Sequence, residues 1–387
     1  MTTNMVTPTG IAELCAVIRD AGREGMPVEL RGGGTKADIG QPDRQGLMVN
    51  MSAFAGIIDY DPAELVLTVG AGTRLSEIDH ILAEQGQMLA FDPFDYGPVF
   101  ARPSGASTIG GIVAAGVSGS RRLSAGAARD HMLGFEAVSG RGEAFIGGGK
   151  VMKNVTGYDL PKLMTGSWGR LAALTSLTVK VMPRPQTCAT LLLRGLDDEA
   201  AVAAMARAMG SPADVACAAH LPEAGLTLLR IEGFAPSVVA RSDMLRALLR
   251  QGDLLADGAD EPLWAAVRGG GTLQGEAILW RISTAPSRGP EVFRALQHLG
   301  ARRCYDWAGG LIWLSLPEDA DQHCVRQVVA QTWGHATLIR APAALRASMS
   351  ALHVEEPGVA ALSARVRAAF DPLGVLSPDR FGVAHAH

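Results

Sequence analysis

The sequence predicts an α+β protein with two domains and a short C-terminal segment. Its 387 residues exceed the length at which a single hydrophobic core usually stops growing. Stretches with helical spacing of apolar residues and stretches with strand-like alternation follow one another along the whole chain. The pattern changes after Pro183 and Pro185, where a strand ends. We therefore predict domains over residues 1–185 and 186–340, followed by a C-terminal segment over 341–387.

The first domain begins with a predicted helix over 7–25, because Ile11, Leu14 and Ile18 share one face and Thr9 can act as its N-cap. A second helix is expected over 75–86, starting at Thr73 or Ser76. Residues 107–118 predict a small-residue helix or a tight turn. Strands are predicted over 27–31, 47–50, 65–73 and 175–185, and a hairpin over 135–145 turns at 139–142.

The second domain contains two similar sets of strands and helices, which predict two split-βαβ half-units of an α/β sandwich. Helices are expected over 197–209, 235–252, 290–300 and 320–333, and the C-terminal segment is expected to contain a last helix over 361–370. Strands are expected over 191–196, 214–221, 226–233, 278–284, 302–317 (a hairpin) and 336–341. The apolar helix residues are predicted to lie in the core: Met244, Leu245, Leu248, Leu249, Val325, Val328 and Val329. Five tryptophans follow residue 260, and we expect most in the core and one or two on a partner surface.

Composition excludes several classes of protein. The net charge of −4 makes nucleic acid an unexpected partner. The five cysteines are scattered without a CxxC pair, which disfavours disulfide scaffolds, zinc ribbons and iron–sulfur clusters and favours a reducing cytoplasm. The sequence has neither a signal-peptide pattern nor an apolar run long enough to span a membrane. We therefore expect a cytoplasmic protein that reaches the inner face of the membrane, if at all, peripherally through a partner.

Two glycine-rich segments indicate a ligand site. Residues 31–36 read RGGGTK after an apolar strand; their backbone N–H groups can converge on an anion, although a flexible turn explains the same letters. In residues 103–119, twelve of seventeen residues are Gly, Ala, Ser or Thr, which permits close approach of a ligand or tight helix–sheet packing. A third run, Gly147-Gly148-Gly149-Lys150, is followed by Val151 and so lacks the hydroxyl of a phosphate-binding P-loop. No GxGxxG follows a strand, so a Rossmann site is not expected.

Together these segments resemble the FAD-binding domain of the vanillyl-alcohol-oxidase/PCMH flavoprotein family. Residues 31–35 resemble its pyrophosphate loop, 107–119 its second glycine-rich loop, and 147–175 its closing motif. Residues 121–134 and 152–167 are similar to the FAD-binding subunits of bacterial glycolate oxidase complexes, and 370–381 to the family's C-terminal segment. The resemblance implies a two-lobed PCMH-type FAD-binding domain, a ferredoxin-like α/β cap, and a C-terminal segment that returns to the FAD domain.

The resemblance also implies which residues bind FAD. It places the pyrophosphate against Arg31, Gly32, Gly33, Gly34, Thr35 and Lys36. It places Thr108, Gly110, Gly111, Ser118 and Gly119 along the flavin and ribityl chain, and Gly166, Gly169 and Leu174 near the adenine. The first loop has no histidine, so non-covalent FAD is expected. Trp168 replaces the usual acid and Ala172 the usual glycine, and both changes are expected to crowd the site.

No catalytic or metal-binding residue is predicted. Relatives that oxidise 2-hydroxy acids carry an HxH metal motif, and the only HxH here is His385-Ala386-His387 at the terminus. His131, Tyr158 and Asp159 are expected to be structural, and for Lys150 and Lys153 a place near the flavin and a solvated surface role are equally open.

The resemblance, with no visible base and no cluster ligands in the sequence, implies an FAD-dependent oxidoreductase subunit of a glycolate (2-hydroxy-acid) oxidase complex, which accepts or relays electrons. A sister flavin subunit would supply the base and an iron–sulfur subunit would pass the electrons on. The alternatives are a self-sufficient FAD-dependent dehydrogenase and a structural assembly subunit with a degenerate flavin site.

Overall fold

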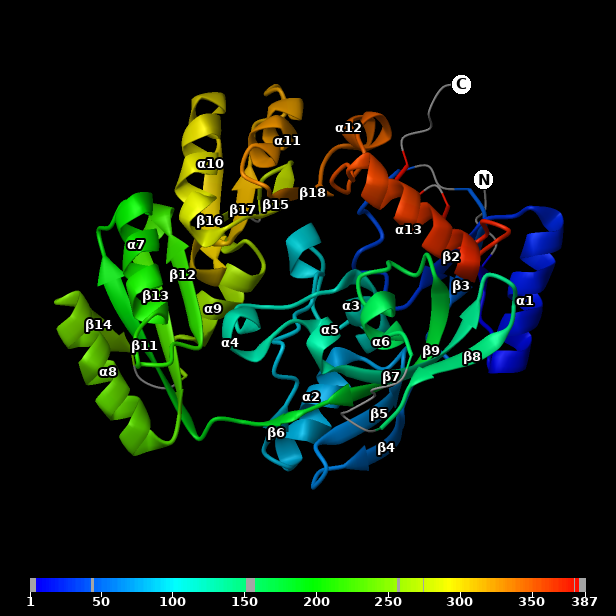
Figure 1. Cartoon of the computed structure of the whole chain (residues 1–387), viewed down its shortest axis with the longest axis horizontal. Coiled ribbons are helices and arrows are strands. Elements are labelled where there is room, and N and C mark those ends of the chain that lie inside the picture. Colours follow the sequence, from blue (N-terminus) through cyan, green and yellow to red (C-terminus); the bar gives the residue numbers. More distant parts are fainter. Residues whose placement is uncertain are drawn as a thin grey trace.

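A computed structural model describes residues 5–42, 45–150, 157–255, 258–273, 275–378 and 380–382. The chain begins with a small parallel sheet in the order β1-β3-β2, formed by β1 (Met5–Val6), β2 (Val28–Arg31) and β3 (Leu47–Asn50). Helix α1 (Ile11–Glu24) buries Leu14 and Ile18 against this sheet in a separate core with Val28 and Val49. This sheet forms the first lobe of the N-terminal half (Figure 1).

The second lobe is a five-stranded antiparallel sheet in the order β4-β5-β9-β7-β8. Its strands are β4 (Ile57–Asp61), β5 (Val66–Gly70), β7 (Met132–Ser139), β8 (Ala144–Gly148) and β9 (Ala172–Lys180). Its helices are α2 (Leu75–Glu84), α3 (Ile109–Ala115), α4 (Arg122–Ala125), α5 (Ala128–His131) and α6 (Leu160–Met164). A short antiparallel pair, β6 (Gln87–Met88) and β10 (Met182–Pro183), leads out of this half. The glycine-rich residues 107–118 contain α3, so the helix forms rather than the tight turn that the sequence left open.

The C-terminal half contains an eight-stranded antiparallel sheet in the order β14-β11-β13-β12-β16-β17-β15-β18. Its strands are β11 (Thr187–Arg194), β12 (Cys217–Leu221), β13 (Leu226–Gly233), β14 (Asp253–Leu255), β15 (Leu279–Ser283), β16 (Arg302–Asp306), β17 (Leu311–Ser315) and β18 (His335–Arg340). Each set of four strands has the βαββαβ order of a ferredoxin-like unit, and one pair, His220 with Tyr305, joins the sets. The two predicted half-units are therefore confirmed, fused edge to edge.

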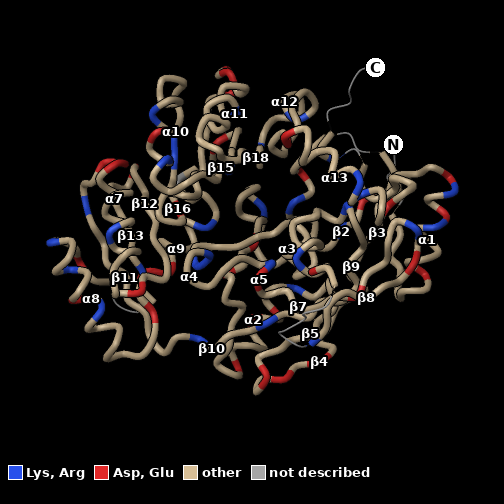
Figure 2. The backbone as a smooth tube through the Cα atoms, viewed as in Figure 1, with Lys and Arg blue, Asp and Glu red and all other residues tan. Residues whose placement is uncertain are grey.

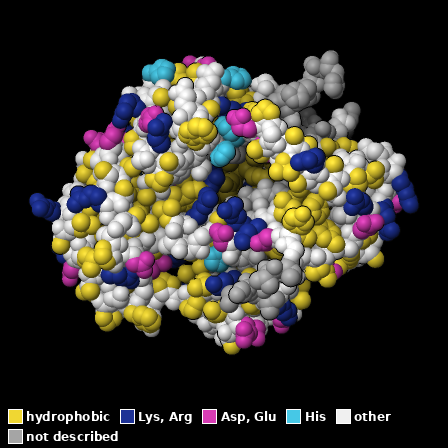
Figure 3. Space-filling view, in the orientation of Figure 1, with side chains coloured by type: hydrophobic (Ala, Val, Ile, Leu, Met, Phe, Trp, Pro, Cys, Tyr) yellow, Lys and Arg dark blue, Asp and Glu magenta, His cyan; other side chains and the backbone are white. Residues whose placement is uncertain are grey.

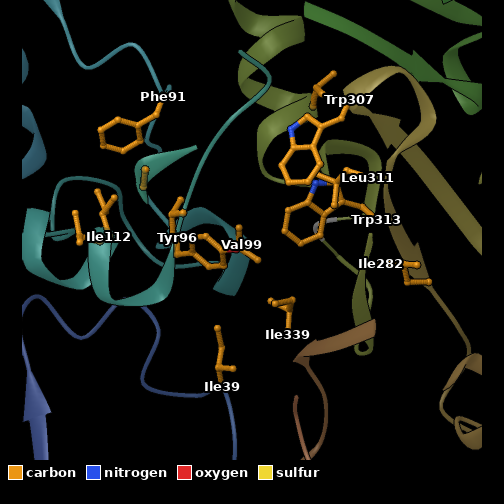
Figure 4. Close-up of a cluster of buried hydrophobic side chains, with 14 of the residues drawn as sticks. Ile39, Phe91, Tyr96, Val99, Ile112, Ile282, Trp307, Leu311, Trp313 and Ile339 are labelled. Carbon is orange, nitrogen blue, oxygen red and sulfur yellow. The ribbon is translucent and has the colours of Figure 1, made fainter. Parts of the chain in front are cut away.

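The two faces of this sheet have different partners. Helices α7 (Asp198–Met209), α8 (Ala235–Leu249), α10 (Gly289–Leu296) and α11 (His323–Ala330) cover the outer face (Figure 1). On the other face, Trp313 and Leu311 of β17 and Trp307 lie opposite Tyr96 and Val99 of the N-terminal half (Figure 4). The cap sheet therefore turns an aromatic surface toward the glycine-rich half.

Hydrogen bonds and ion pairs hold the two halves together. Arg121 forms a bidentate ion pair with Glu232 at 2.8 to 3.1 Å, and the Ser120 hydroxyl donates to Asp306 at 2.7 Å. The indole Nε1 of Trp307 donates to the carbonyl of Gly119 at 3.0 Å. Charged side chains of both signs are distributed over the whole chain rather than on one face (Figure 2). The contact between the two halves therefore combines a buried aromatic cluster with hydrogen bonds and an ion pair.

The C-terminal segment returns to the first lobe. It contains α12 (Ala343–Ser348) and α13 (Pro357–Phe370), and Leu376 then bridges Val28 of β2 in parallel. Asp371 accepts the amides of Val375 and Leu376, which shapes this return. The predicted domain boundaries at 185 and 340 coincide with the two ends of the segment that forms the eight-stranded sheet. They stay a prediction.

Several local expectations were wrong. Gly10, not Thr9, is the N-cap of α1; the Thr9 amide and hydroxyl donate to Glu13 instead. Helix α2 starts after Arg74 without a side-chain cap, so neither Thr73 nor Ser76 plays that role. Met244 is 42% exposed, because it lies on the outer face of α8. Strand β4 and helix α9 (Glu261–Arg268) were not predicted.

Candidate functional site

The predicted glycine-rich loops meet at one pocket in the N-terminal half. Its empty volume, including the open mouth, is about 790 Å³. The wall comes from the loop after β2, the start of α3, the turn before β9, and the C-terminal segment. Of the predicted residues, these line it: Arg31, Gly32, Gly33, Gly34, Thr35, Lys36, Thr108, Gly110, Gly111, Gly169 and Leu174. Segments far apart in sequence are thus brought together around one space.

The loop after β2 is packed tightly against the loop before α3. A Cβ atom at Gly33 would lie 1.5 Å from the backbone carbonyl oxygen of Ala106, and Gly34 has φ +71°, so both positions require glycine. The hydroxyls of Thr35 and Ser107 lie 3.0 Å apart and fix the contact from the other side. The backbone of the first loop can therefore approach a ligand closely.

Asp95 stabilises the loop before α3 through hydrogen bonds. Its carboxylate accepts the amides of Gly97 and Gly105 at 2.7 Å, and the amide and hydroxyl of Ser107 at 3.1 and 2.9 Å. Burial alone would raise the pKa of Asp95, but these hydrogen bonds outweigh it and lower the pKa. The sequence analysis missed this residue, although an Asp two residues before a glycine is typical of such turns.

Lys36 is a buried cation in the pocket wall. Its ammonium lies 3.3 Å from the Thr35 hydroxyl and 5.2 Å from the centre of the Tyr96 ring. Burial, against the opposing influence of Asp95, lowers its pKa to about 8. An anionic ligand in the pocket would stabilise the charged form of this lysine.

The charge and hydrogen-bonding groups of the pocket fit a diphosphate. Its charged lining residues are Arg31, Lys36, Arg380 and Glu29, so positive charge is in excess. The buried Nε of Arg31 has no hydrogen-bond partner among the described residues. Thr108 caps α3 by accepting the Gly111 amide at 3.4 Å, and the start of the helix faces the pocket. Backbone donors, cations and a glycine cradle are the features that a dinucleotide's pyrophosphate requires.

Three predicted residues lie outside the pocket lining. The buried Ser118 hydroxyl accepts the Ala128 amide at 3.0 Å, and Gly119 is wedged against Asp92 and bonded to Trp307. Gly166, with φ +83°, donates its amide to Val113 and shapes the turn before Trp168. Ser118 and Gly119 therefore lie at the junction with the cap, and Gly166 supports the wall from behind.

Both predicted departures from the family pattern fall in the pocket wall. Trp168 and Ala172 line the pocket, and Trp168 adopts φ +58° while its amide bonds to the Ala114 carbonyl at 2.7 Å. The guanidinium of Arg380 lies 5.3 Å from the Trp168 ring centre and donates to the Lys36 carbonyl at 2.6 Å. Arg380, which the sequence analysis did not select, therefore closes the pocket from the far end of the chain.

The remaining candidates have other positions. His131 bonds to the Ala125 carbonyl at 2.7 Å, Asp159 caps α6, Tyr158 is 91% exposed, and Lys150 pairs with Asp59. Lys153 and His385 to His387 lie outside the described residues. The described residues contain no cluster of three metal-ligating side chains, and no helix among them is long and apolar enough to cross a membrane.

Comparisons with known proteins agree with this geometry. A family model described as an FAD binding domain matches residues 3–147. The glycolate oxidase subunit GlcE of Escherichia coli is 32% identical over 362 residues, which is 92% of each chain. The D-lactate dehydrogenase of Archaeoglobus fulgidus is 30% identical over 49% of this chain and 41% of its own length. The glycolate oxidase subunit GlcD of E. coli is 31% identical over 49% of this chain and 36% of its own.

Solved structures agree on the fold. That of p-cresol methylhydroxylase superposes with a TM-score of 0.71 at 15% identity, covering 97% of this chain and 88% of that one. That of 4-ethylphenol oxidase from Gulosibacter chungangensis gives 0.70 at 14% identity, covering 98% and 89%. The architecture is therefore shared from end to end despite very different sequences.

Proposed function

Because the chain belongs to the family of the glycolate oxidase subunit GlcE, we propose that it is the FAD-binding subunit of a multi-subunit glycolate (2-hydroxy-acid) oxidase, in which it accepts or relays electrons. The predicted resemblance, the α+β PCMH-type fold and FAD as cofactor are confirmed by the family match and the structural neighbours. The observation that carries the proposal is the cationic glycine cradle, assembled from both predicted loops. It would hold FAD mainly through residues 32–36 and 108–111.

FAD supplies a group that takes two electrons as hydride and returns them singly. The chain's own part is to bind and orient it: Lys36 and Arg31 would neutralise the diphosphate, and the aromatic face of the cap would exclude water. No histidine, cysteine or tyrosine lines the pocket among the described residues, which supports non-covalent attachment. In the proposed complex, a sister flavin subunit would supply the base that takes the substrate's proton.

The transfer of electrons onward requires a further partner. The five cysteines, at 15, 188, 217, 304 and 324, form no disulfide among the described residues and are spread over both halves, so they do not suit an iron–sulfur cluster. We assign the cluster to a separate iron–sulfur subunit, and attachment to the cytoplasmic face of the membrane to the assembled complex. One observation favours the structural alternative: Trp168 and Arg380 occupy part of the pocket wall.

The absorbance spectrum tests the proposal. We expect the chain, purified alone and with its partner subunits, to show the flavin bands, and acid precipitation to release the flavin into the supernatant. Glycolate oxidation should need the complex. Full-rate oxidation by the isolated chain would contradict the subunit role, and a colourless chain that stays colourless after soaking with FAD would favour the structural alternative.

A further inference from the structure

A second cavity lies beside the linker that joins the two halves. Its empty volume, including the open mouth, is about 1040 Å³, and it shares no lining residue with the glycine-rich pocket. Its wall combines β6, the segment around α4 and α5, the linker after β10, and the start of α8. Figure 1 shows the chain between β9 and β11 crossing from one half to the other. Figure 3 shows the surface hollowed between the halves, with Lys, Arg and His side chains along their boundary.

Two basic side chains in the wall of this linker cavity lack an acidic partner. Lys180 ends β9 and Arg184 directly follows β10, and within the described part of the chain neither has a carboxylate at salt-bridge distance. The Nε of Arg184 donates to the Gln87 carbonyl at 3.0 Å, which orients the guanidinium. Burial raises the pKa of Asp79 and the charge of Arg184 opposes this rise, but the two side chains form no ion pair. Both cations therefore remain available to an anion.

The carboxylate in the same wall is already paired. Glu232 accepts a bidentate ion pair from Arg121, which also lines the cavity, at 2.8 to 3.1 Å. Arg230 adds a second ion pair to Glu232 at 2.9 Å. Glu232 therefore balances Arg121 and leaves the charges of Lys180 and Arg184 uncompensated in the lining.

Two further groups in the wall favour an anion. Phe234 is the N-cap of the 15-residue helix α8 and makes no side-chain capping hydrogen bond, so the positive end of the helix lies uncapped at the cavity. His131 is only 5% exposed. Its Nε2 donates to the Ala125 carbonyl at 2.7 Å, and its buried Nδ1 has no hydrogen-bond partner among the described residues. Once protonated, this nitrogen would donate to an anionic oxygen.

The remaining wall is largely apolar. Its apolar side chains are Met88, Ala90, Met182, Pro183, Pro185 and Phe234. The Phe234 ring is 67% exposed, so one of its faces can pack on a ligand. The cavity is as large as those that hold small organic ligands, and a bare ion would leave most of it unused. The wall therefore fits an anion that carries an organic group.

We propose that the linker cavity binds an organic phosphate monoester, with its phosphate toward Lys180 and Arg184 and its organic group against Phe234 and the linker prolines. A phosphate monoester carries a charge of about −1.5 to −2 at pH 7 and three strong acceptor oxygens, which match two uncompensated cations. A single carboxylate would leave one of them unbalanced. Because Lys180 belongs to the N-terminal half and Phe234 to the cap, the ligand would also hold the cap in place. The inference does not rest on the proposed function.

Calorimetric titration of the full-length chain with phenyl phosphate, inorganic phosphate and phenol tests the proposal. The buffer is free of phosphate, and excess FAD keeps the glycine-rich pocket filled. We expect phenyl phosphate to bind more tightly than inorganic phosphate and phenol not to bind. Lys180→Gln and Arg184→Gln should each raise the Kd for phenyl phosphate by about tenfold, as loss of one charged hydrogen-bonding partner predicts. The control Arg365→Gln removes an exposed charge on α13, outside the cavity lining, and should change the Kd by less than about twofold.

Three results would overturn the inference: phenol binding as tightly as phenyl phosphate, an unchanged Kd in the Lys180→Gln/Arg184→Gln variant, or no binding of phenyl phosphate by the native chain. Circular dichroism and thermal unfolding show whether each variant is folded. Vesicles with and without phosphatidic acid distinguish the source of the phosphate. Sedimentation with phosphatidic acid that the double variant loses would assign it to a lipid head group, and phenyl phosphate binding without sedimentation would assign it to a soluble ester.

Discussion

The substitution Gly33→Ala tests the cofactor cradle most directly. The added Cβ would lie 1.5 Å from the carbonyl oxygen of Ala106, whereas carbon and oxygen normally approach no closer than about 3.3 Å. The obstacle is backbone, not the end of a flexible side chain. One of the two loops must therefore move by roughly 1.8 Å, the difference between these distances.

The size of the effect follows from what that shift separates. Backbone donors that reach a diphosphate contribute about 1.5–3 kcal/mol each. Moving two of them out of range should cost ~3–6 kcal/mol of binding free energy, or roughly a hundredfold to ten-thousandfold in the Kd for FAD. Overpacking itself should lower the free energy of unfolding by about 1–3 kcal/mol.

The assay is fluorescence titration of the cofactor-free variant with FAD, beside urea unfolding. Gly10→Ala is the matched control: Gly10 is extended, with φ −158°, and its Cβ would meet nothing within 4 Å. We expect the control to bind FAD like the native chain. A Gly33→Ala variant whose Kd stays within about threefold of native would show that the loop does not hold the diphosphate.

Three further predictions concern pH and packing. Burial, against Asp95, lowers the pKa of Lys36 from 10.5 to about 8, so above pH 8 the unfolded chain binds more protons than the folded one. The stability of the cofactor-free chain should thus rise between pH 8 and 10.5 by up to ~1.4 kcal/mol per pH unit, and urea unfolding of Lys36→Met should lack this rise. Burial raises the pKa of Asp306 from 3.8 to about 7, so between these pH values the folded chain binds more protons than the unfolded chain. The contribution of Asp306 to the free energy of unfolding therefore falls as the pH rises from 3.8 to 7. The same urea series on Asp306→Asn should show a smaller fall, and an identical slope would count against this. Thermal unfolding should show that Trp313→Ala, at a fully buried site, costs ~3–5 kcal/mol. Trp333→Ala, at a site 95% exposed, should cost under about 0.5 kcal/mol, and equal losses would contradict the core assignment.

The spacing of apolar residues predicted most of the strands and the main helices, because this spacing reflects which face of each element is buried. Helices α7 and α8 and the hairpin of β16 and β17 follow their predicted ranges. Strand β4 was missed because its side chains are largely exposed on an edge and lack a buried alternation. The predicted N-caps of α1 and α2 were wrong for a similar reason. Gly10 and Arg74 occupy these N-cap positions, and neither makes a side-chain capping hydrogen bond that the sequence could indicate.

The sequence could indicate the two glycine-rich loops because only a few residue types allow the backbone to approach a ligand closely. Gly33 and Thr108 belong to runs rich in small residues, and the resemblance of both runs to ordered family motifs distinguished a ligand site from a flexible turn or tight packing. Arg380 was not accessible, because it acts on Lys36, 344 positions earlier, and an ordinary Arg carries no local mark of such a contact. Asp95 has a local turn signal, an Asp two residues before a glycine, but nothing nearby in the sequence shows that its carboxylate reaches Ser107.

The order of elements, read from the chain alone, determined the α+β class, and the resemblance of its glycine-rich segments to known motifs indicated the flavoprotein family and FAD. The tertiary structure decided which residues share a space. It placed Ser118 and Gly119 at the junction with the cap, and it set Lys180, Arg184 and Phe234 in the wall of one cavity. The reason is that periodicity reports burial along one segment, whereas charge balance and pocket walls depend on side chains that folding brings together from opposite ends of the chain.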